Sequence, residues 1–256
     1  TKLMDECKAM GIQTLGPDVN ESNLKFTVNH DGNIRFGLGA VKGVGEAAVQ
    51  SIMEERKKNG PFLGIFDFVQ RVNLNACNKK NMECLALAGG FDSFPELKRE
   101  QYFAANSKGE LFLETLMRYG NRYQADKAAA VNSLFGGENV IDVATPEIPQ
   151  GVERWSDLDR LNRERDLVGI YLFAHPLDEF SIVLEHVCNT RMSELEDKAA
   201  LAGREITMGG IVTSVRRGVS KNGNPYGIAK IEDYSGSTEI PFWGNDWVTY
   251  QGYLNE

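Results

Sequence analysis

The spacing of the hydrophobic residues changes near residue 204, and this change constrains the fold more than any other feature of the sequence. Between about 37 and 120, apolar residues recur every three or four positions, as at Val44, Ala48 and Ile52, which is typical of amphipathic helices. From Arg204 the period drops to two, which is typical of half-buried strands. We therefore expect an α+β chain in which a mostly helical part precedes a β-rich part.

The β-rich part is expected to be a small antiparallel meander. The turn sequences SKNGNP and DYSG separate its strands, and WVTYQGYL after them has the pattern of a helix. Three such strands followed by a helix make most of a five-stranded barrel of the OB type, so we expect a truncated barrel whose closing strands are missing. The expected strands are Ile206–Val215, Tyr226–Asp233 and Thr238–Trp243.

The rest of the chain divides by composition. A first segment is too short to be a domain, and several helices follow it, one of them expected from Asn78 to Ala88. An Ala-rich stretch then leads into LFGGENV and ATPEIPQ, which favours a linker or loop, and a helical connector precedes the β-rich part. The expected divisions are 1–36, 37–120, 121–154, 155–200 and 201–256.

Composition limits the function classes that the chain can belong to. The 256 residues have a formal net charge of −8, so any nucleic-acid contact has to come from locally basic segments. The four cysteines form no Cys-x-x-Cys pair and the three histidines do not stand at metal-ligand spacing, so we expect reduced thiols and no metal site. No apolar run approaches the roughly 18 residues of a membrane span, which predicts a cytoplasmic chain without membrane contact.

No catalytic constellation is visible in the sequence. The carboxylates of DLDRLNRERD stand at helical-surface spacing, and we expect them to pair with arginines of the same helix. No Asp-x-Asp pair lies on an expected strand, where it could hold magnesium. The residues of this chain are therefore expected to bind rather than to catalyse.

A tight glycine turn stands directly before one of the helical runs. Gly43, Val44 and Gly45 let the backbone turn sharply, and the helix after them points unpaired N–H groups and the positive end of its dipole toward the same space. A phosphate fits such a place, and Lys42 adds a cation beside it.

Two kinds of phosphate site share this pattern. Gly43-x-Gly45-x-x-Ala48 matches the dinucleotide fingerprint, which needs a hydrophobic strand before it and an acidic residue about 20 positions later. The preceding FGLGAVK is a poor strand and Asp67 lies in a helical pattern, so this alternative is disfavoured. The second kind is the helix-hairpin-helix, whose Gly-x-Gly hairpin presents backbone amides to a DNA phosphate.

A second copy of the hairpin is predicted at Gly89, Gly90 and Phe91, with Lys98 and Arg99 after it. Paired hairpins suit the two strands of a duplex. The simpler alternative is that both glycine pairs only cap helices, as glycines do at many helix C-termini.

The β-rich part combines cations with aromatic residues, the pairing by which OB surfaces bind single-stranded nucleic acid. Its aromatic side chains are Tyr226, Phe242 and Trp243. The alternative for the last two is that they face the core and that the basic loop is only solvated. The cations are Arg216, Arg217, Lys221 and Lys230.

Several long motifs occur in an order that resembles the alpha subunit family of bacterial DNA polymerase III, the C-family replicative polymerases. They are ECKAMGI, PDVN, IRFGLGAVKGVGEAAV, GPF, FDF, AGGFDSF, LVGIYLFAHPLDEF and IVTSVRRGVSKNGNPYGIAKIED. The resemblance implies the end of a fingers domain, a duplex-binding tandem helix-hairpin-helix and the start of an OB domain. It also implies that the magnesium-binding aspartates of the DNA-directed DNA polymerase lie in a palm domain outside this chain, so no cofactor is expected here.

The resemblance also identifies one further motif. The internal peptide by which this family binds the sliding clamp, the beta subunit, is similar to VNSLFG at 131–136, with Ser133, Leu134 and Phe135 matching and Val131 in place of a glutamine. The alternative is a loop that folds its apolar pair back onto the domain. The resemblance thus implies as partners primer-template duplex DNA, single-stranded DNA, the sliding clamp and other replisome subunits. The alternative class is a purely structural scaffold, which would bind neither kind of DNA.

Overall fold

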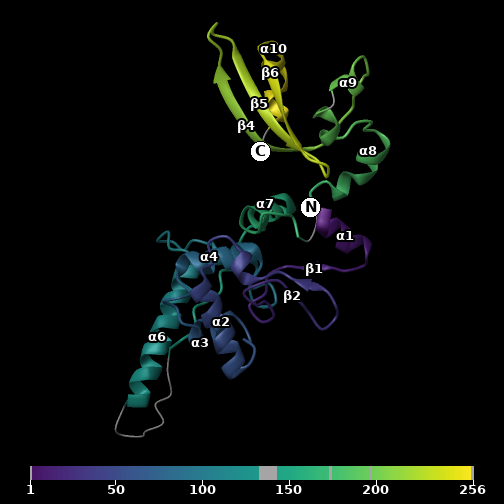
Figure 1. Ribbon diagram of the computed structural model, residues 1–256. Helices are drawn as coiled ribbons and strands as arrows, with labels where there is room; N and C mark the ends of the chain where they lie inside the picture. The colour runs from purple at the N-terminus through teal and green to yellow at the C-terminus, as the bar shows by residue number, and fades with distance from the viewer. Residues whose placement is uncertain (1, 133–142, 173–174, 197, 255–256) are drawn as a thin grey trace. The chain divides into compact units, whose positions relative to one another are not determined.

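The computed structural model describes residues 2–132, 143–172, 175–196 and 198–254 (Figure 1). They fall into two compact units, Thr1–Ala174 and His175–Glu256, which we call unit 1 and unit 2. Unit 1 is mainly helical and contains one small sheet, and unit 2 contains a larger antiparallel sheet. The chain is therefore α+β, which confirms the fold class predicted from the change of hydrophobic period.

Unit 1 starts with helix α1 and a sheet of two-residue strands, in which β3 pairs with β1 in parallel and with β2 in antiparallel orientation. The helices that follow hold the candidate site. The described elements are α1 (Lys2–Ala9), β1 (Thr14–Leu15), β2 (Thr27–Val28), β3 (Ile34–Arg35), η1 (Leu38–Ala40), α2 (Glu46–Asn59), α3 (Ile65–Arg71), α4 (Lys79–Ala88), α5 (Arg99–Tyr102), α6 (Phe112–Asn132) and α7 (Asp157–Val168).

Local sequence explains where α4 begins and ends. The side chain of Asn78 accepts a hydrogen bond from the N–H of Asn81 at 3.2 Å, so Asn78 caps the N-terminus. At the other end Gly89 takes a left-handed conformation, with φ of 85°, that stops the helix. The predicted helix, Asn78 to Ala88, ends at the observed residue and starts one residue early.

A buried chain of aromatic rings forms the centre of the core of unit 1. The ring of Phe68 on α3 lies with its centroid 4.8 Å from that of Phe62 and 5.2 Å from that of Phe91. All three side chains are buried. The core therefore joins the turn after α2, helix α3 and the loop after α4 into one packed body.

Residues 121–132, where we expected a linker to begin, are the second half of α6. The linker prediction was wrong there because alanine, which dominates 128–130, is the residue with the highest helix propensity. The side chain of Gln124 also anchors this helix, since its Nε2 donates to the carbonyl oxygens of Val69 at 2.8 Å and Val72 at 2.9 Å. Figure 1 shows the end of α6 extending past α2 and α3.

Unit 2 is built on a three-stranded sheet in the order β4-β5-β6 with antiparallel neighbours. Trp247 of α10 packs on one face, so close to Gly227 that a Cβ there would stand 2.1 Å from the indole ring. Among the described residues the sheet does not close, which fits the truncated barrel that we expected. The elements are η2 (Asp178–Phe180), α8 (Ser181–His186), η3 (Met192–Glu196), α9 (Lys198–Leu201), β4 (Ile211–Val219), β5 (Pro225–Glu232), β6 (Ser237–Trp243), α10 (Asn245–Tyr250) and η4 (Gln251–Tyr253).

The first strand of this sheet lies further along the chain than predicted. Strand β4 covers Ile211–Val219 instead of Ile206–Val215. The residues before it pair with the connector, because Asn189 donates its N–H to the carbonyl oxygen of Thr207 at 2.9 Å and accepts from the N–H of Thr207 at 2.8 Å. A backbone used in this way is not available to β5.

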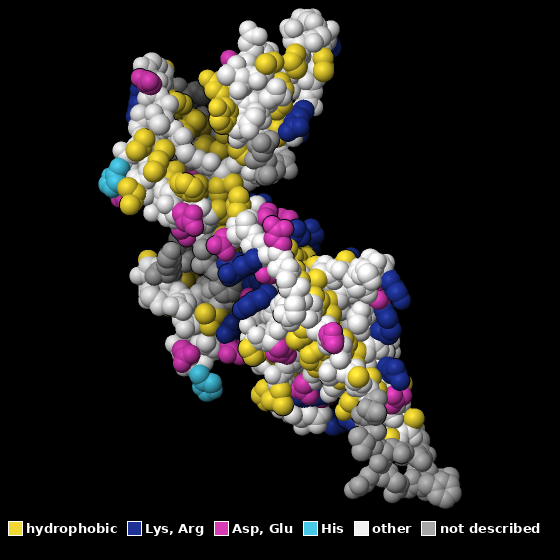
Figure 2. All heavy atoms as spheres, turned by 180° about the vertical axis from the view of Figure 1, so that it is seen from behind, with side chains coloured by type: hydrophobic (Ala, Val, Ile, Leu, Met, Phe, Trp, Pro, Cys, Tyr) yellow, Lys and Arg dark blue, Asp and Glu magenta, His cyan; other side chains and the backbone are white. Residues whose placement is uncertain are grey.

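Charges of both signs are interspersed on the surface. In Figure 2, Lys and Arg side chains in dark blue lie near Asp and Glu side chains in magenta over much of the visible face. This mixture agrees with the formal net charge of −8, and it means that a nucleic-acid site on this chain has to be local. Among the described residues, no helix is both long and apolar enough to cross a membrane.

Candidate nucleic-acid interface

The predicted glycine turn lies between η1 and α2, and we call Lys42–Gly45 the first hairpin. Gly43 has a φ of 86°, and Gly45 is the N-cap of α2. Val44 is buried under the turn, whereas Lys42, Gly43 and Gly45 are exposed. The arrangement of short helix, glycine turn and longer helix is that of a helix-hairpin-helix.

Gly43 is needed at its position for two reasons. Its positive φ is a conformation that residues with a side chain rarely adopt. In addition, a Cβ on Gly43 would stand 2.6 Å from the Sγ of Cys84 on α4, which is closer than real Cβ atoms come. The turn is therefore packed directly against α4.

Two hydrogen bonds fix the first hairpin to neighbouring helices. The N–H of Lys42 donates to the carbonyl oxygen of Leu167 on α7 at 2.9 Å, and the N–H of Gly45 donates to Oδ1 of Asn81 on α4 at 2.8 Å. Asn81 is nearly fully buried and was missed by the sequence analysis, because its partner lies 36 positions away.

Three backbone amides at and just after this turn lack an acceptor among the described residues. Within the described part of the chain, the N–H groups of Gly43, Glu46 and Ala47 make no hydrogen bond. Glu46 and Ala47 are the first two residues of α2, where N–H groups have no partner within the helix and the helix dipole is positive. An anionic oxygen atom is the natural acceptor for such a group of donors.

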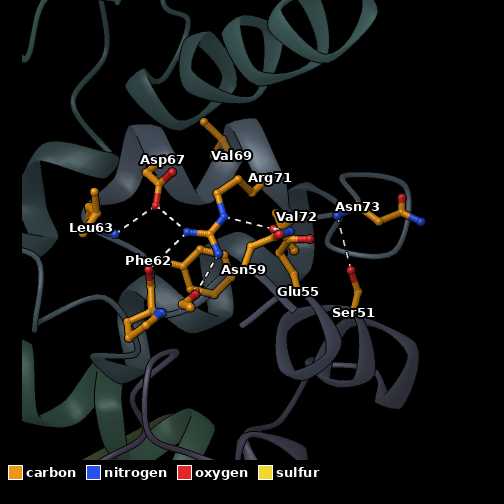
Figure 3. Close-up of polar contacts among 12 residues, drawn as sticks. Ser51, Glu55, Asn59, Phe62, Leu63, Asp67, Val69, Arg71, Val72 and Asn73 are labelled. Carbon is orange, nitrogen blue, oxygen red and sulfur yellow. Dashed lines mark hydrogen bonds and ion pairs between the residues drawn. The ribbon is translucent and has the colours of Figure 1, made fainter. Parts of the chain in front are cut away.

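The far end of α2 is held by Arg71, which joins α2, α3 and the turn between them (Figure 3). Its Nε donates to Oε1 of Glu55 at 2.9 Å and its Nη1 to Oδ2 of Asp67 at 2.7 Å. Nη2 donates to the carbonyl oxygen of Gly60 at 2.7 Å, and the guanidinium lies 4.6 Å from the centre of the Phe62 ring. This cluster fixes the direction of α2 and hence of its N-terminus.

The second predicted hairpin has a different geometry. The N–H groups of Gly89 and Gly90 donate to Ala86 and Leu85, at 3.3 and 2.7 Å, as in an ordinary helix C-cap. The side chain of Phe91 is buried in the aromatic core. The two glycine amides are therefore already used, which is the simpler alternative that the sequence left open for this pair.

Arg99, which we placed in a basic stretch, is buried. Its guanidinium pairs with Oδ2 of Asp92 at 2.5 Å and with Oε2 of Glu164 at 2.9 Å. Glu164 is one of the α7 carboxylates that we expected to pair within their own helix, and this expectation was wrong because Glu164 faces the core. Burial raises the pKa of Glu164, and Arg99 opposes that rise.

The sheet of unit 2 has an outer face, opposite α10, that gathers several of the predicted residues. Tyr226 stands opposite Trp243 and Gly218 in the register, and residues paired across antiparallel strands share a face. The rings of Tyr226 and Trp243 lie 4.9 Å apart at 36°, and Trp243 is 55% exposed. Arg216 and Lys230 alternate onto the same face.

The other predicted residues of this sheet lie elsewhere. Phe242 packs in the core with Trp247, so one of the two aromatic residues left open faces inward and the other, Trp243, faces outward. Arg217 lies on the side of α10, with its guanidinium 6.0 Å from the ring of Trp247. Lys221 is exposed in the turn between β4 and β5.

The peptide similar to a clamp-binding motif lies mostly outside the described residues. Ser133, Leu134 and Phe135 belong to the segment 133–142, which the structure does not describe. Val131 belongs to the last turn of α6.

The dinucleotide alternative is not supported. A 3₁₀-helix, Leu38–Ala40, stands where the fingerprint needs a strand, and β3 ends at Arg35. Asp67 lies on α3 and pairs with Arg71. The strand-turn-helix unit that a dinucleotide requires is therefore missing at Gly43.

Comparison with known proteins agrees with the class that this geometry defines. Residues 11–102 match the family model of the helix-hairpin-helix motif. This range includes the first hairpin, the second hairpin and the helices α2 to α4 between and around them.

The relatives identify the family. The chain is 34% identical to the DNA polymerase III subunit alpha of Pasteurella multocida over 254 residues, which is 99% of this chain and 21% of that protein. It is 34% identical to that of Mycobacterium tuberculosis and 32% identical to that of Vibrio cholerae, over 96% and 99% of this chain and 20% and 21% of those proteins. The chain belongs to the family of DNA polymerase III alpha subunits and spans about a fifth of the length of these curated relatives.

Proposed function

We propose that this chain is the part of a replicative polymerase that binds primer-template duplex DNA, and that the first hairpin contacts a backbone phosphate. The observation that carries this proposal is the group of three amides, of Gly43, Glu46 and Ala47, that have no acceptor among the described residues. Lys42 adds a cation next to them. Phosphate contacts carry little sequence information, which suits an enzyme that copies any sequence.

A matched pair of substitutions at the N-cap tests this proposal. Gly45→Asp and Gly45→Asn both supply a favourable N-cap side chain, and a Cβ at this position would have its nearest contact at 3.9 Å, so both variants should fold. They differ in charge at the place where we put the phosphate. Fluorescence anisotropy of a labelled duplex should show salt-sensitive binding that Gly45→Asp weakens far more than Gly45→Asn. Equal binding by the two variants would contradict the proposal.

A second binding function is proposed for the outer face of the sheet, namely single-stranded template DNA. The supporting observation is the Tyr226 and Trp243 ring pair with Lys230 on the same face, because stacked aromatics and cations bind single strands without reading sequence. Trp243→Ala should weaken binding of oligo(dT) by about 1–3 kcal/mol. Tyr253→Ala is the matched control, since Tyr253 is 84% exposed but lies outside this face. Equal losses of oligo(dT) affinity in both variants would show that the outer face of the sheet is not the binding site.

A third proposal is that the peptide Val131 to Phe135 binds the sliding clamp of the replisome. It rests on the similarity of Ser133, Leu134 and Phe135 to the family's clamp peptide, since apolar anchors in a short segment can carry most of the binding energy of an interface. Leu134→Ala with Phe135→Ala should abolish capture of the chain on immobilised clamp, and Val131→Gln should strengthen it. The catalytic magnesium site would lie in other parts of the polymerase.

A further inference from the structure

The first two turns of α4 pack against the first hairpin, although the sequence assigns the two to different repeats. Asn81 holds the amide of Gly45, and the Sγ of Cys84 lies against Gly43. Lys80, which directly precedes Asn81 on the same helix, has its Cε 3.8 Å from the position that a Cβ of Gly43 would occupy. A lysine side chain of α4 thus reaches the glycine turn.

The charge of Lys80 is available there. Its neighbour Lys79 is engaged, because it pairs with Glu114 at 2.5 Å and with Glu83 at 3.7 Å. For Lys80 and Lys42, by contrast, the described residues provide no ion pair. Both lysines are exposed.

The charge of Lys80 also acts on the cysteine that packs against the turn. Burial raises the pKa of Cys84, and the positive charge of Lys80 opposes that rise. The Sγ of Cys84 and the Cε of Lys80, the carbon that bears the ammonium group, lie 2.6 and 3.8 Å from the position that a Cβ of Gly43 would occupy. The nearest acidic residue of α2, Glu46, accepts a hydrogen bond from Nε2 of Gln50 at 3.3 Å.

We propose that Lys80 is a second cationic ligand of the DNA phosphate at the first hairpin. This inference rests on the proposed function of that hairpin, and it assigns to α4 a direct part in the contact. The phosphate would then meet the amides at the start of α2 and two ammonium groups. One belongs to Lys42, next to Gly43 in sequence, and the other to Lys80 of α4. Two positive charges at one place would attract a phosphate locally, although the net charge of the whole chain is negative.

The salt dependence of duplex binding tests Lys80 separately from the hairpin. Each phosphate contact contributes about 0.9 to the slope of log affinity against log salt concentration for duplex DNA. Lys80→Gln should therefore lower the slope by about 0.9 and weaken binding at low salt. Lys57→Gln is the matched control, because Lys57 is an exposed lysine in the last turn of α2 and should leave the slope unchanged.

Every outcome decides between the two proposals. If Gly45→Asp abolishes binding while Lys80→Gln keeps the slope of the unchanged chain, Lys80 is not a ligand and the hairpin proposal stands. If Lys80→Gln and Lys57→Gln lower the slope equally, the cation effect is general and the Lys80 proposal is wrong. If the unchanged chain shows no duplex binding, or Gly45→Asp has no effect, the hairpin proposal fails and the Lys80 proposal fails with it. Thermal unfolding of each variant verifies that it is folded.

Discussion

Gly43 combines two structural demands that no other residue type meets together. Its backbone is left-handed, and the Sγ of Cys84 occupies the space into which a side chain would grow. The sequence shows that a glycine turn is present, but it does not show the cysteine 41 positions away that makes the turn tight. Close packing on α4 fixes the backbone of the turn, where the amide of Gly43 has no acceptor among the described residues.

Gly43→Ala should therefore lower the free energy of unfolding by about 2–4 kcal/mol. This is the cost of a left-handed backbone for a residue with a Cβ plus the cost of forcing a methyl group into a packed site. Urea denaturation measures this change. Gly45→Ala is the control, because its φ is −77° and its nearest contact is at 3.9 Å, so it should cost only a few tenths of that amount. Adding Cys84→Ala to Gly43→Ala should recover part of the loss, and equal stability of the single and double variants would contradict the packing explanation.

At the scale of helices, a buried ion pair joins α5 to α7. Arg99 and Glu164 have side chains 5% and 1% exposed, and they meet across 65 positions of sequence. The same helix α7 accepts the N–H of Lys42 through Leu167, so the position of α7 and the shape of the first hairpin are connected.

Arg99→Met should destabilise unit 1 by about 3–5 kcal/mol, because it leaves the carboxylate of Glu164 buried without its partner. Adding Glu164→Leu should restore much of this loss, since an apolar pair avoids the cost of burying charge. A double-mutant cycle by urea denaturation measures both effects. If the double variant is no more stable than Arg99→Met alone, the pair is not the source of the destabilisation.

The loss in Arg99→Met should also depend on pH. Burial raises the pKa of Glu164 above its value in the unfolded chain, and Arg99 opposes that rise. Without Arg99 the rise is larger, so the folded variant should hold this proton more tightly than the unchanged folded chain does. Stability then falls as pH rises from the ordinary glutamate value of about 4.3 through the raised folded value. Urea denaturation at pH 5 and pH 8 should show a smaller loss at pH 5. A loss independent of pH would show that the carboxyl of Glu164 is not responsible.

Helices with a clear apolar period and local caps could be predicted from the sequence, as α4 illustrates. Their signals lie within a few residues, such as Asn78 before α4 and Gly89 after it. Contacts between distant residues could not be predicted in this way. Asn81 on Gly45 and Glu164 on Arg99 each depend on how two helices pack, and Lys80 reaches the hairpin for the same reason.

At the scale of the whole molecule, the two units carry two different candidate surfaces on an acidic chain. The first hairpin of unit 1 offers amides and lysines for a duplex phosphate, and the outer face of the sheet in unit 2 offers rings for unstacked bases. Each surface is made only of residues from its own unit. The two binding activities should therefore be separable by mutation.

Gly45→Asp should weaken binding of duplex DNA and leave the affinity for oligo(dT) within a factor of about two, and Trp243→Ala should do the reverse. Anisotropy titrations of both variants with both ligands make this comparison. A variant that loses both activities to the same extent would mean that one surface serves both ligands, and the assignment of two sites would be wrong.

The central claim is that backbone amides of the first hairpin donate to a DNA phosphate, and amide NMR tests it most directly. Titration of the labelled chain with a short duplex should shift the amide signals of Gly43, Glu46 and Ala47 most strongly. The amides of Lys42 and Gly45, which already donate within the chain, should shift less. Large shifts confined to other segments, with those three amides unchanged, would contradict the account.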